Sequence, residues 1–266
     1  FEYAASYVSE AVKRVLGVLK PGISERDLSD ELRLGRLPLS CHPMISSGER
    51  TKFGLASPSD KVIRRGETFQ IAVGVQGALT CRAGWVAEGP KDLPAEVQDY
   101  AEVLAKPYFE CAAAWYEAVG IGVSGDELDM LVKPHLGDPF FGVKLNPGHL
   151  IHLDEWMNSP IYPGSEETLC SGQAIQLDII PATGSAYGTA NIEDGIVLLD
   201  EKGRSEFADR YPDAWGRIEM RRSFMREMLN IRLKPEVLPM SNLAGYFAPF
   251  MLSPSNVFVR GDASIA

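Results

Sequence analysis

The sequence lacks the features that mark several common functional classes. It has no run of basic residues, and its 26 Lys and Arg are outnumbered by 36 Asp and Glu, which gives a formal net charge of −10. Nucleic acid and anionic lipid both repel an acidic chain, so neither is expected as a partner. The sequence also has no apolar run as long as a membrane span and no secretory signal. These absences favour a soluble cytoplasmic protein that acts on small molecules.

Cysteine is scarce, and its spacing excludes two further classes. None of the 4 cysteines forms a C-x-x-C pair with another. A disulfide framework and a zinc knuckle both depend on such regular spacing, so we expect reduced thiols. The cysteines are Cys41, Cys81, Cys111 and Cys170.

The chain is long enough for one large core, and its pattern repeats. Ser24, at the start of a predicted helix, has a counterpart in Ser124, and the glycine turn at Gly66 has one in Gly172. We therefore expect a single domain over 1–266, with a first half of about 1–93, a second half of about 94–203, and a C-terminal helix and strap of about 204–266. Because the chain begins directly in a helical pattern, an N-terminal domain is expected upstream.

The repeat differs at one strand position. "GETFQIAVGV" at Gly66–Val75 has Ala72 where "GQAIQLDIIP" at Gly172–Pro181 has Asp178. Two copies of helices followed by strands indicate an α+β fold in which two halves meet around a pseudo-twofold axis. A site between the halves would take residues from equivalent strands, and the acid is expected from the second half.

Two further residues join Asp178 as candidates for catalysis. His149 follows a glycine in "NPGHLIHLDEW", and Glu193 lies in the strand pattern "NIEDGIVLL", where Gly195 indicates a bulge. Carboxylates on apolar strands are costly to bury, so they should be paired, hydrogen-bonded or metal-bound. By contrast, His152 with its neighbours Asp154 and Glu155 is expected to be mainly solvated.

These elements together resemble the pita-bread fold family of methionine aminopeptidase, Xaa-Pro aminopeptidase, prolidase and creatinase. The resemblance covers nearly the whole chain and implies two pseudo-twofold related halves around a central cleft, usually in a homodimer. It rests on four stretches, which are Gly48–Val75, Gly148–His149, "GSEETLCSGQAIQLD" and "NIEDGIVLLDEKG".

The resemblance also implies that a pair of metal ions has been lost. The metallopeptidases of this family hold two ions with two Asp, one His and two Glu. The two Asp fall at Ala72 and Ala83, the His is retained as His149, the first Glu is shortened to Asp178 and the second is retained as Glu193. Methyl groups cannot bridge two cations. No cofactor is therefore expected, or at most one weakly held divalent metal.

Two auxiliary histidines of the family are also replaced, by Leu55 and Trp156. Creatinase, a relative that works without metal, shows that the fold can hydrolyse a C–N bond by acid–base chemistry. On that precedent we expect His149 to carry the proton, while Arg82 binds a ligand carboxylate and Trp156 and His152 contact the ligand.

The sequence leaves three functions open. The first is a metal-independent hydrolase of a C–N bond in a small amide or peptide-like ligand, or a binder of such a ligand. The second is a non-catalytic protein-recognition module. The third is a mononuclear metallohydrolase that uses His149, Asp178 and Glu193.

Overall fold

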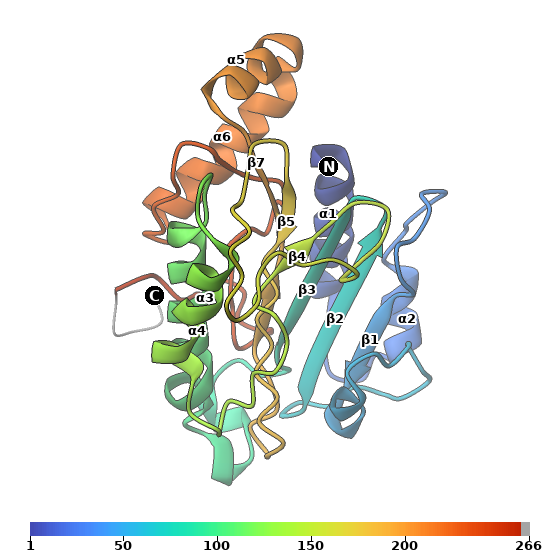
Figure 1. The fold of residues 1–266 in the computed structure, drawn as a ribbon. Coiled ribbons are helices and arrows are strands. Elements are labelled where there is room, and N and C mark those ends of the chain that lie inside the picture. Colours follow the sequence, from blue (N-terminus) through green and yellow to red (C-terminus); the bar gives the residue numbers. More distant parts are fainter. Residues whose placement is uncertain (262–266) are drawn as a thin grey trace.

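Two four-stranded antiparallel sheets form the centre of the protein, and the computed structural model describes residues 1–261 (Figure 1). The first sheet has the strand order β1-β2-β3-β6 and the second has the order β4-β5-β7-β8. The strands are β1 (Met44–Ser47), β2 (Thr68–Val75), β3 (Ala78–Trp85), β4 (His149–Leu150), β5 (Ala174–Gln176), β6 (Asn191–Glu193), β7 (Gly195–Leu198) and β8 (Val237–Pro239).

Each sheet is covered on its outer side by helices from its own half. Helices α1 and α2 lie on one flank of the molecule, and α3 and α4 lie on the opposite flank (Figure 1). The α-helices are α1 (Glu2–Val18), α2 (Glu25–Asp30), α3 (Lys106–Ala118), α4 (Gly125–Leu136), α5 (Glu201–Arg210) and α6 (Pro212–Glu227).

Helix α1 is amphipathic, with one buried apolar face. Val8, Val12 and Val15 are fully buried, and they belong to one core cluster with Phe69 and Ile71 of β2. Side chains three and four residues apart share a helix face, so α1 presents a continuous apolar stripe to the sheet.

The sequence of Ala95–Val119 has the pattern of one long helix, but the structure interrupts it. A π-helical segment at Ala101–Ala105 precedes α3, which begins at Lys106. Pro107 has no backbone N–H, so a helix reaching it from the N-terminal side loses a hydrogen bond at this point. The break is therefore a local consequence of one proline.

The predicted internal duplication is present in the backbone. Ser24 bridges Val62, and Ser124 bridges Thr168 in the same antiparallel manner. Backbone hydrogen bonds recur at the same offsets of 100 and 106 residues. Equivalent pairs are Gly22 N–H to Ile63 O and Gly122 N–H to Leu169 O, and Glu25 N–H to Lys61 O and Gly125 N–H to Glu167 O. The α+β fold of two related halves predicted from the sequence is confirmed.

One strand of the second half contributes to both sheets. β6 pairs with β3 of the first half, whereas β7, which starts at Gly195, pairs with β5 and β8. The bulge expected at Gly195 is thus a change of sheet at Asp194. The strand passes from one half to the other at the residue next to Glu193.

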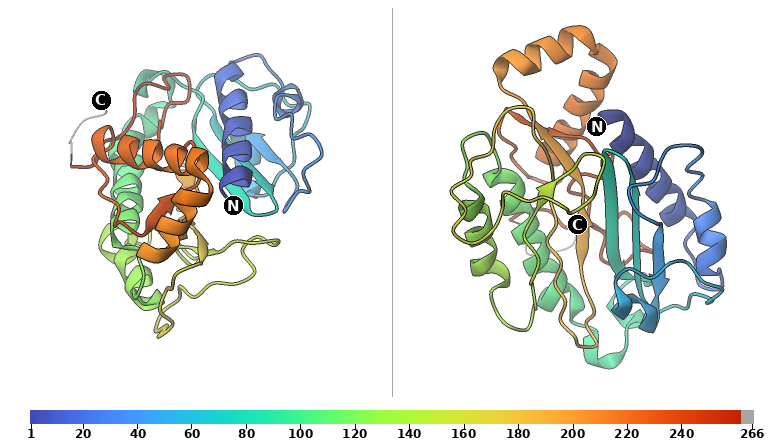
Figure 2. Two further views of the ribbon diagram at one scale, coloured as in Figure 1. Left: turned by 90° about the horizontal axis from the view of Figure 1, so that it is seen from above. Right: turned by 45° about the vertical axis from the view of Figure 1, so that its right-hand side comes forward.

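The C-terminal part contains a helical hairpin and a strap. Helices α5 and α6 project beyond the sheets (Figure 2). The strap that follows packs on the domain, where Phe250 is buried and pairs with Trp85 at the end of β3. Within residues 1–261, no helix combines the length and the apolar character needed to cross a membrane.

Candidate active site

A row of side chains crosses the inner face of the sheets where the two halves meet. Ala72 of β2 lies opposite Cys81 of β3, and Cys81 lies opposite Glu193 of β6. Neighbouring strands place such partners side by side on one face. The first half thus contributes a methyl group and a thiol to this row, and the second half contributes a carboxylate.

Asp178 extends the row on the far side of Glu193. β5 and β7 pair Gln176 with Gly195, and beyond that pair the Leu177 N–H donates to the Asp194 carbonyl at 3.3 Å. If this antiparallel register continues by one more residue on each strand, Asp178 lies beside Glu193. The carboxyl group therefore lies just past the end of β5, whereas the sequence pattern predicted a position on the strand itself.

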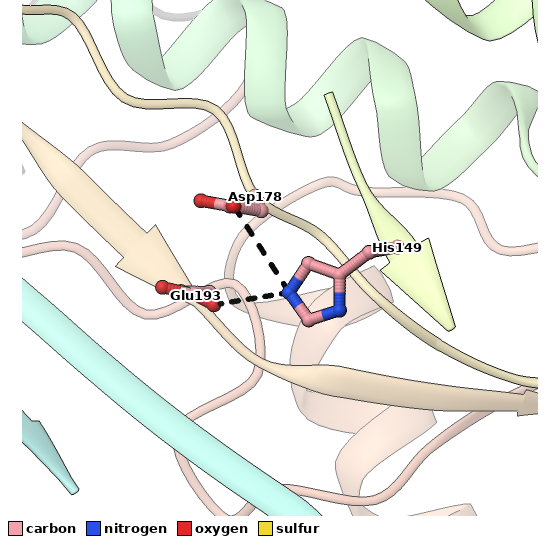
Figure 3. A group of neighbouring side chains, drawn as sticks. All are labelled: His149, Asp178 and Glu193. Atoms are coloured by element: carbon pink, nitrogen blue, oxygen red, sulfur yellow. Dashed lines mark ion pairs between the residues drawn. The ribbon is translucent and has the colours of Figure 1, made fainter. Parts of the chain in front are cut away.

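His149 completes the cluster from β4, where it lies opposite Gln176. Its Nε2 atom is 3.7 Å from Oε1 of Glu193 and 4.0 Å from Oδ2 of Asp178 (Figure 3). Its Nδ1 atom is 2.9 Å from the Leu150 carbonyl oxygen, which can only accept a hydrogen bond, so Nδ1 carries a proton. Nε2 therefore faces the two acids. In the neutral ring it presents a lone pair that can accept a proton, and in the imidazolium it carries a proton that it can donate.

Burial makes this cluster electrostatically unusual. His149, Asp178 and Glu193 are all buried, and among the described residues neither Nε2 of His149 nor Oδ1 of Asp178 has a hydrogen-bond partner. Burial, with Glu193 nearby, raises the pKa of Asp178 well above its usual range. Burial, with Asp194 nearby, raises the pKa of Glu193 to about 8. Polar atoms left unpaired in this way are suited to receive a cation, a proton or a donor group of a ligand.

Glu155 is the exception in the segment expected to be solvated, since His152 and Asp154 are exposed whereas Glu155 is buried. The side chain is 3% exposed, its Oε1 atom accepts a hydrogen bond from the Ser40 hydroxyl at 3.3 Å, and Oε2 has no partner within the described chain. Burial, and then the charge of Glu193, raise its pKa to about 8. A third buried carboxyl group therefore lies near the cluster.

The cluster lines a cavity of about 550 Å³ between the halves. Both residues at the auxiliary histidine positions also line it, but Leu55 is 60% exposed and Trp156 is 50% exposed. They lie at the mouth and leave the interior open. The volume lies in the range of small-molecule sites, and the lining combines many apolar side chains with a few polar groups, as such sites usually do.

Arg82 does not reach the cavity. Adjacent residues on a strand point to opposite faces, so Arg82 points away from the face that carries Cys81 and Ala83. Arg82 is 2% exposed, and its guanidinium donates to Asp194 Oδ2 at 2.7 Å and to the Leu243 carbonyl. Arg82 therefore forms a buried ion pair with Asp194 and does not bind a ligand carboxylate in this cavity, contrary to the expectation from the sequence.

His152 is also separate from the cluster. It is exposed, its ring packs edge-on against Phe1 with ring centroids 5.8 Å apart, and it does not line the cavity. The predicted ligand-contacting set is therefore divided, since Trp156 lines the cavity while Arg82 and His152 do not.

The residues present do not fit a pair of metal ions but fit one. Ala72 and Ala83 line the cavity and offer no oxygen donor. His149, Asp178 and Glu193 each provide one ligand atom, and these atoms lie within 4.8 Å of one another. One imidazole and two carboxylates are a donor set suited to one divalent cation with open positions.

Sequence reasoning missed two residues of this region. Glu155 follows Asp154 in a polar loop, and nothing in a single sequence marks its burial. Lys144, on the loop before His149, lines the cavity. Its signal was a charged residue within a glycine- and proline-containing loop next to a candidate catalytic residue.

Comparisons with known proteins agree with this architecture. Residues 1–200 match the model of metallopeptidase family M24. The chain is 24% identical over 216 residues to the uncharacterized peptidase YqhT of Bacillus subtilis (strain 168), and the match covers 77% of this chain and 58% of that protein. The chain thus spans less than two thirds of this curated relative.

Solved structures with similar folds are peptidases. The prolidase from Pyrococcus horikoshii OT3 has a TM-score of 0.60 at 21% identity, over 74% of this chain and 58% of its own. Aminopeptidase PepP of Pseudomonas aeruginosa has a TM-score of 0.61 at 17% identity, over 74% of this chain and 52% of its own. At these identities the likeness shows the fold, and it confirms the pita-bread architecture.

Proposed function

Since the chain belongs to metallopeptidase family M24, we propose that it binds a small amide or peptide-like ligand between its halves and hydrolyses the C–N bond without a pair of metal ions. The observation that carries this proposal is the buried, incompletely paired cluster of His149, Asp178 and Glu193 on an open cavity. Such clusters of perturbed groups in concave sites are typical of acid–base chemistry.

His149 is the proton carrier in this proposal. Its Nε2 atom takes a proton from a water molecule as the water oxygen forms a bond to the carbonyl carbon of the ligand. The imidazolium then donates this proton to the departing nitrogen as the C–N bond breaks, so that no oxidant or further reactant is needed. The Nδ1 hydrogen bond to the Leu150 carbonyl holds the ring in place.

Asp178 and Glu193 support that proton transfer. Both carboxylates lie within about 4 Å of Nε2, where a negative charge stabilises an imidazolium. Because burial raises the pKa of each acid, the pair holds fewer than two negative charges near neutral pH. The proposed active form therefore contains shared protons in the cluster, and activity should change as these acids lose them.

A second candidate is a hydrolase that uses one metal ion, and the compact donor set favours it. His149, Asp178 and Glu193 would hold the ion, which would act as a Lewis acid and lower the pKa of bound water. Asp178 and Glu193 would then be ligands that cannot also hold protons. The two candidates therefore assign different roles to these three residues, proton transfer in the first and metal binding in the second.

One experiment separates the candidates. The purified protein is assayed on a panel of small amides and dipeptides, including Xaa-Pro dipeptides, before and after exhaustive chelation, and its metal content is measured by elemental analysis. Turnover that survives chelation in metal-free protein supports the first candidate. Turnover lost on chelation and restored by Mn²⁺, Co²⁺ or Zn²⁺ at one ion per chain supports the second.

Absence of turnover combined with saturable ligand binding would leave a binding protein on the peptidase fold. Absence of both turnover and small-ligand binding would contradict the proposal and favour a protein-recognition module.

A further inference from the structure

A second, smaller cavity lies on helix α6, which projects with α5 beyond the sheets (Figure 2). Its volume is about 290 Å³, and no described residue lines both this cavity and the one between the halves. It also lies beyond residue 200, where the match to the family model ends. We call it the α6 groove; the side chains that shape it are Arg217, Met220, Arg221 and Phe224 of α6, with Ser241 and Asn242.

Arg221 of the groove has one buried nitrogen without a partner. The residue is 7% exposed. Its Nη2 atom donates to Glu2 Oε1 at 2.9 Å and to the Ser6 hydroxyl at 2.7 Å, and its Nε atom donates to Asn242 Oδ1 at 2.8 Å. Within residues 1–261, Nη1 forms no hydrogen bond. A buried donor on a charged group is costly to leave unpaired, so an acceptor that enters the groove would be stabilised.

The charges around Arg221 do not balance. Arg217 also binds Glu2, through Nε at 2.8 Å and Nη2 at 2.7 Å. Glu2 is the only acid of the described chain that forms an ion pair with either arginine. Burial raises the pKa of Glu2, but hydrogen bonds from Arg217 and Arg221 outweigh burial and lower the pKa to about 2, so Glu2 is ionised. Two guanidinium groups therefore share one carboxylate.

The neighbouring polar groups of the groove are already paired. Asn242 accepts from Arg221 through Oδ1, and its Nδ2 atom donates to Glu10 Oε1 at 2.9 Å. The Ser241 hydroxyl oxygen accepts from the Leu243 N–H at 3.0 Å. The feature left for a ligand is thus a positively charged donor, which a carboxylate matches in both charge and hydrogen bonding.

A row of exposed apolar side chains runs beside the arginines. Met220 is 66% exposed, Phe224 is 38% exposed and Met228, the residue after α6, is 63% exposed. Residues four apart are neighbours on a helix surface, so the row follows one side of α6. Methionine, aromatic residues and arginine are enriched together at protein–protein interfaces.

We propose that the α6 groove binds a segment of a partner protein that carries one carboxylate next to large apolar side chains. The carboxylate accepts a hydrogen bond from Nη1 of Arg221, and the apolar side chains cover Met220, Phe224 and Met228. This inference goes beyond the proposed function, because it concerns a different surface and no step of the reaction.

A protein segment fits this surface better than a small anion or a lipid. A small anion in the groove would leave the apolar row uncovered as far as Met228. A flat lipid surface would not reach Arg221, which is buried, and anionic lipid is repelled by the net charge of −10.

The test selects ligands without assuming their sequence. A displayed library of short random peptides is selected on immobilised wild-type protein in the presence of excess soluble Met220→Asp, which removes peptides that bind elsewhere. We expect the selected peptides to share an Asp or Glu close to Leu, Met or Phe. The tightest peptide is then synthesised with blocked ends, and its affinity is measured by fluorescence polarisation. Replacing its acid with the amide should weaken binding about tenfold, within the range of a hydrogen bond to a charged group.

Three variants separate the groove from the rest of the surface. Met220→Asp, at an exposed position, puts a competing acid beside the arginines and should abolish binding. Arg221→Met should weaken the acidic peptide about tenfold and leave the amide peptide unchanged. Met130→Asp, at a methionine of α4 that is 46% exposed, is the matched control and should bind as the wild type does. Circular dichroism checks the folding of Arg221→Met, and Met220→Asp keeps the test decisive if that variant does not fold.

Several results would overturn the inference. One is a selection that yields no peptide specific for the wild type over Met220→Asp, or yields peptides without a shared acid. Another is equal affinity for the acidic and the amide peptide. A wild type that sediments as a dimer, with Met220→Asp as a monomer, would make this face a contact between copies of the chain. Binding to phosphatidylserine vesicles that Met220→Asp abolishes would favour a lipid surface instead.

Discussion

The two halves of the molecule place different chemistry at equivalent positions of the inner face. Cys81 and Glu193 face each other where the halves meet, and Ala72 and Asp178 flank them on either side. A pseudo-twofold axis between Cys81 and Glu193 therefore relates a methyl and a thiol to two carboxylates. The two halves share the backbone pattern, whereas the acids of this row lie on one side of the axis.

The same relation extends to His149. Ser46 lies opposite Gln70 in the first half, as His149 lies opposite Gln176 in the second. Both side chains are buried, and both have a polar atom without a partner in the described chain. The halves thus differ in chemistry at three equivalent positions while they share one framework, and at these positions only the second half has an imidazole and carboxylates.

The largest expected effect comes from removing the proton carrier. His149→Ala should lower turnover by roughly 10²–10⁴-fold, the usual contribution of a general acid–base group. Ser46→Ala, at the equivalent position in the first half, should leave turnover close to the wild type. Steady-state kinetics would show this, with circular dichroism as the check on folding, and equal losses in the two variants would contradict the one-sided site.

The next largest effect is a loss of stability from changing Arg82, which lies on the face of β3 opposite to the cavity. Arg82→Met leaves Asp194 buried without its cation and should reduce the free energy of unfolding by about 3–5 kcal/mol. Urea denaturation would measure the loss, and the double variant Arg82→Met/Asp194→Asn should recover part of it. A variant of normal stability that binds carboxylate ligands poorly would instead restore Arg82 as a ligand contact.

A third expectation is a stability that falls as pH rises. The pKa of Glu193 is raised from 4.5 to about 8, so the folded state binds more protons than the unfolded state between these values. Its stabilising contribution is complete below pH 4.5 and is lost as pH rises through about 8. The loss is on the order of a few kcal/mol, since one unit of pKa corresponds to about 1.4 kcal/mol.

Thermal unfolding across this pH range would test that expectation. Glu193→Gln should flatten the decline in unfolding temperature, and the exposed Glu96→Gln should not. A Glu193→Gln profile that parallels the wild type would show that Glu193 titrates normally.

The smallest expected effect is a gain. Ala72→Asp places a carboxylate at the position equivalent to Asp178 and should raise the affinity for Mn²⁺ by about tenfold, because affinity in such sites follows the number of charged ligands. Calorimetry with Mn²⁺ would measure it, and Ala95→Asp, at an exposed position outside the cavity lining, is the control. Unchanged affinity in Ala72→Asp would mean that position 72 lies too far from the cluster to act with it.

Much of this arrangement could be predicted from the sequence because it is periodic or repeated. Val8, Val12 and Val15 recur at helical spacing, as α1 requires, and the offsets of Ser24 and Gly66 from their copies indicate the duplication. The grouping of His149, Asp178 and Glu193 followed from the resemblance to the family, since these residues lie far apart in the chain.

The errors concern properties that a single sequence does not display. Arg82 directly follows Cys81 on β3, so strand alternation turns its side chain to the opposite face. Glu155 is buried because its loop folds back to Ser40, a contact between segments 115 residues apart. Such long-range contacts have no periodic signature, and they decided which polar residues of the loop lie inside.

The change of sheet at Asp194 also affects how the protein unfolds. The first half borrows β6 as its fourth strand, so separating the halves would leave β3 with an exposed edge and its backbone groups unpaired. Neither copy of the repeat contains all four strands of its sheet, because β6 completes the first sheet and the C-terminal β8 completes the second. The protein should denature in one cooperative step, and a fragment containing one copy alone should be prone to strand exchange with its neighbours.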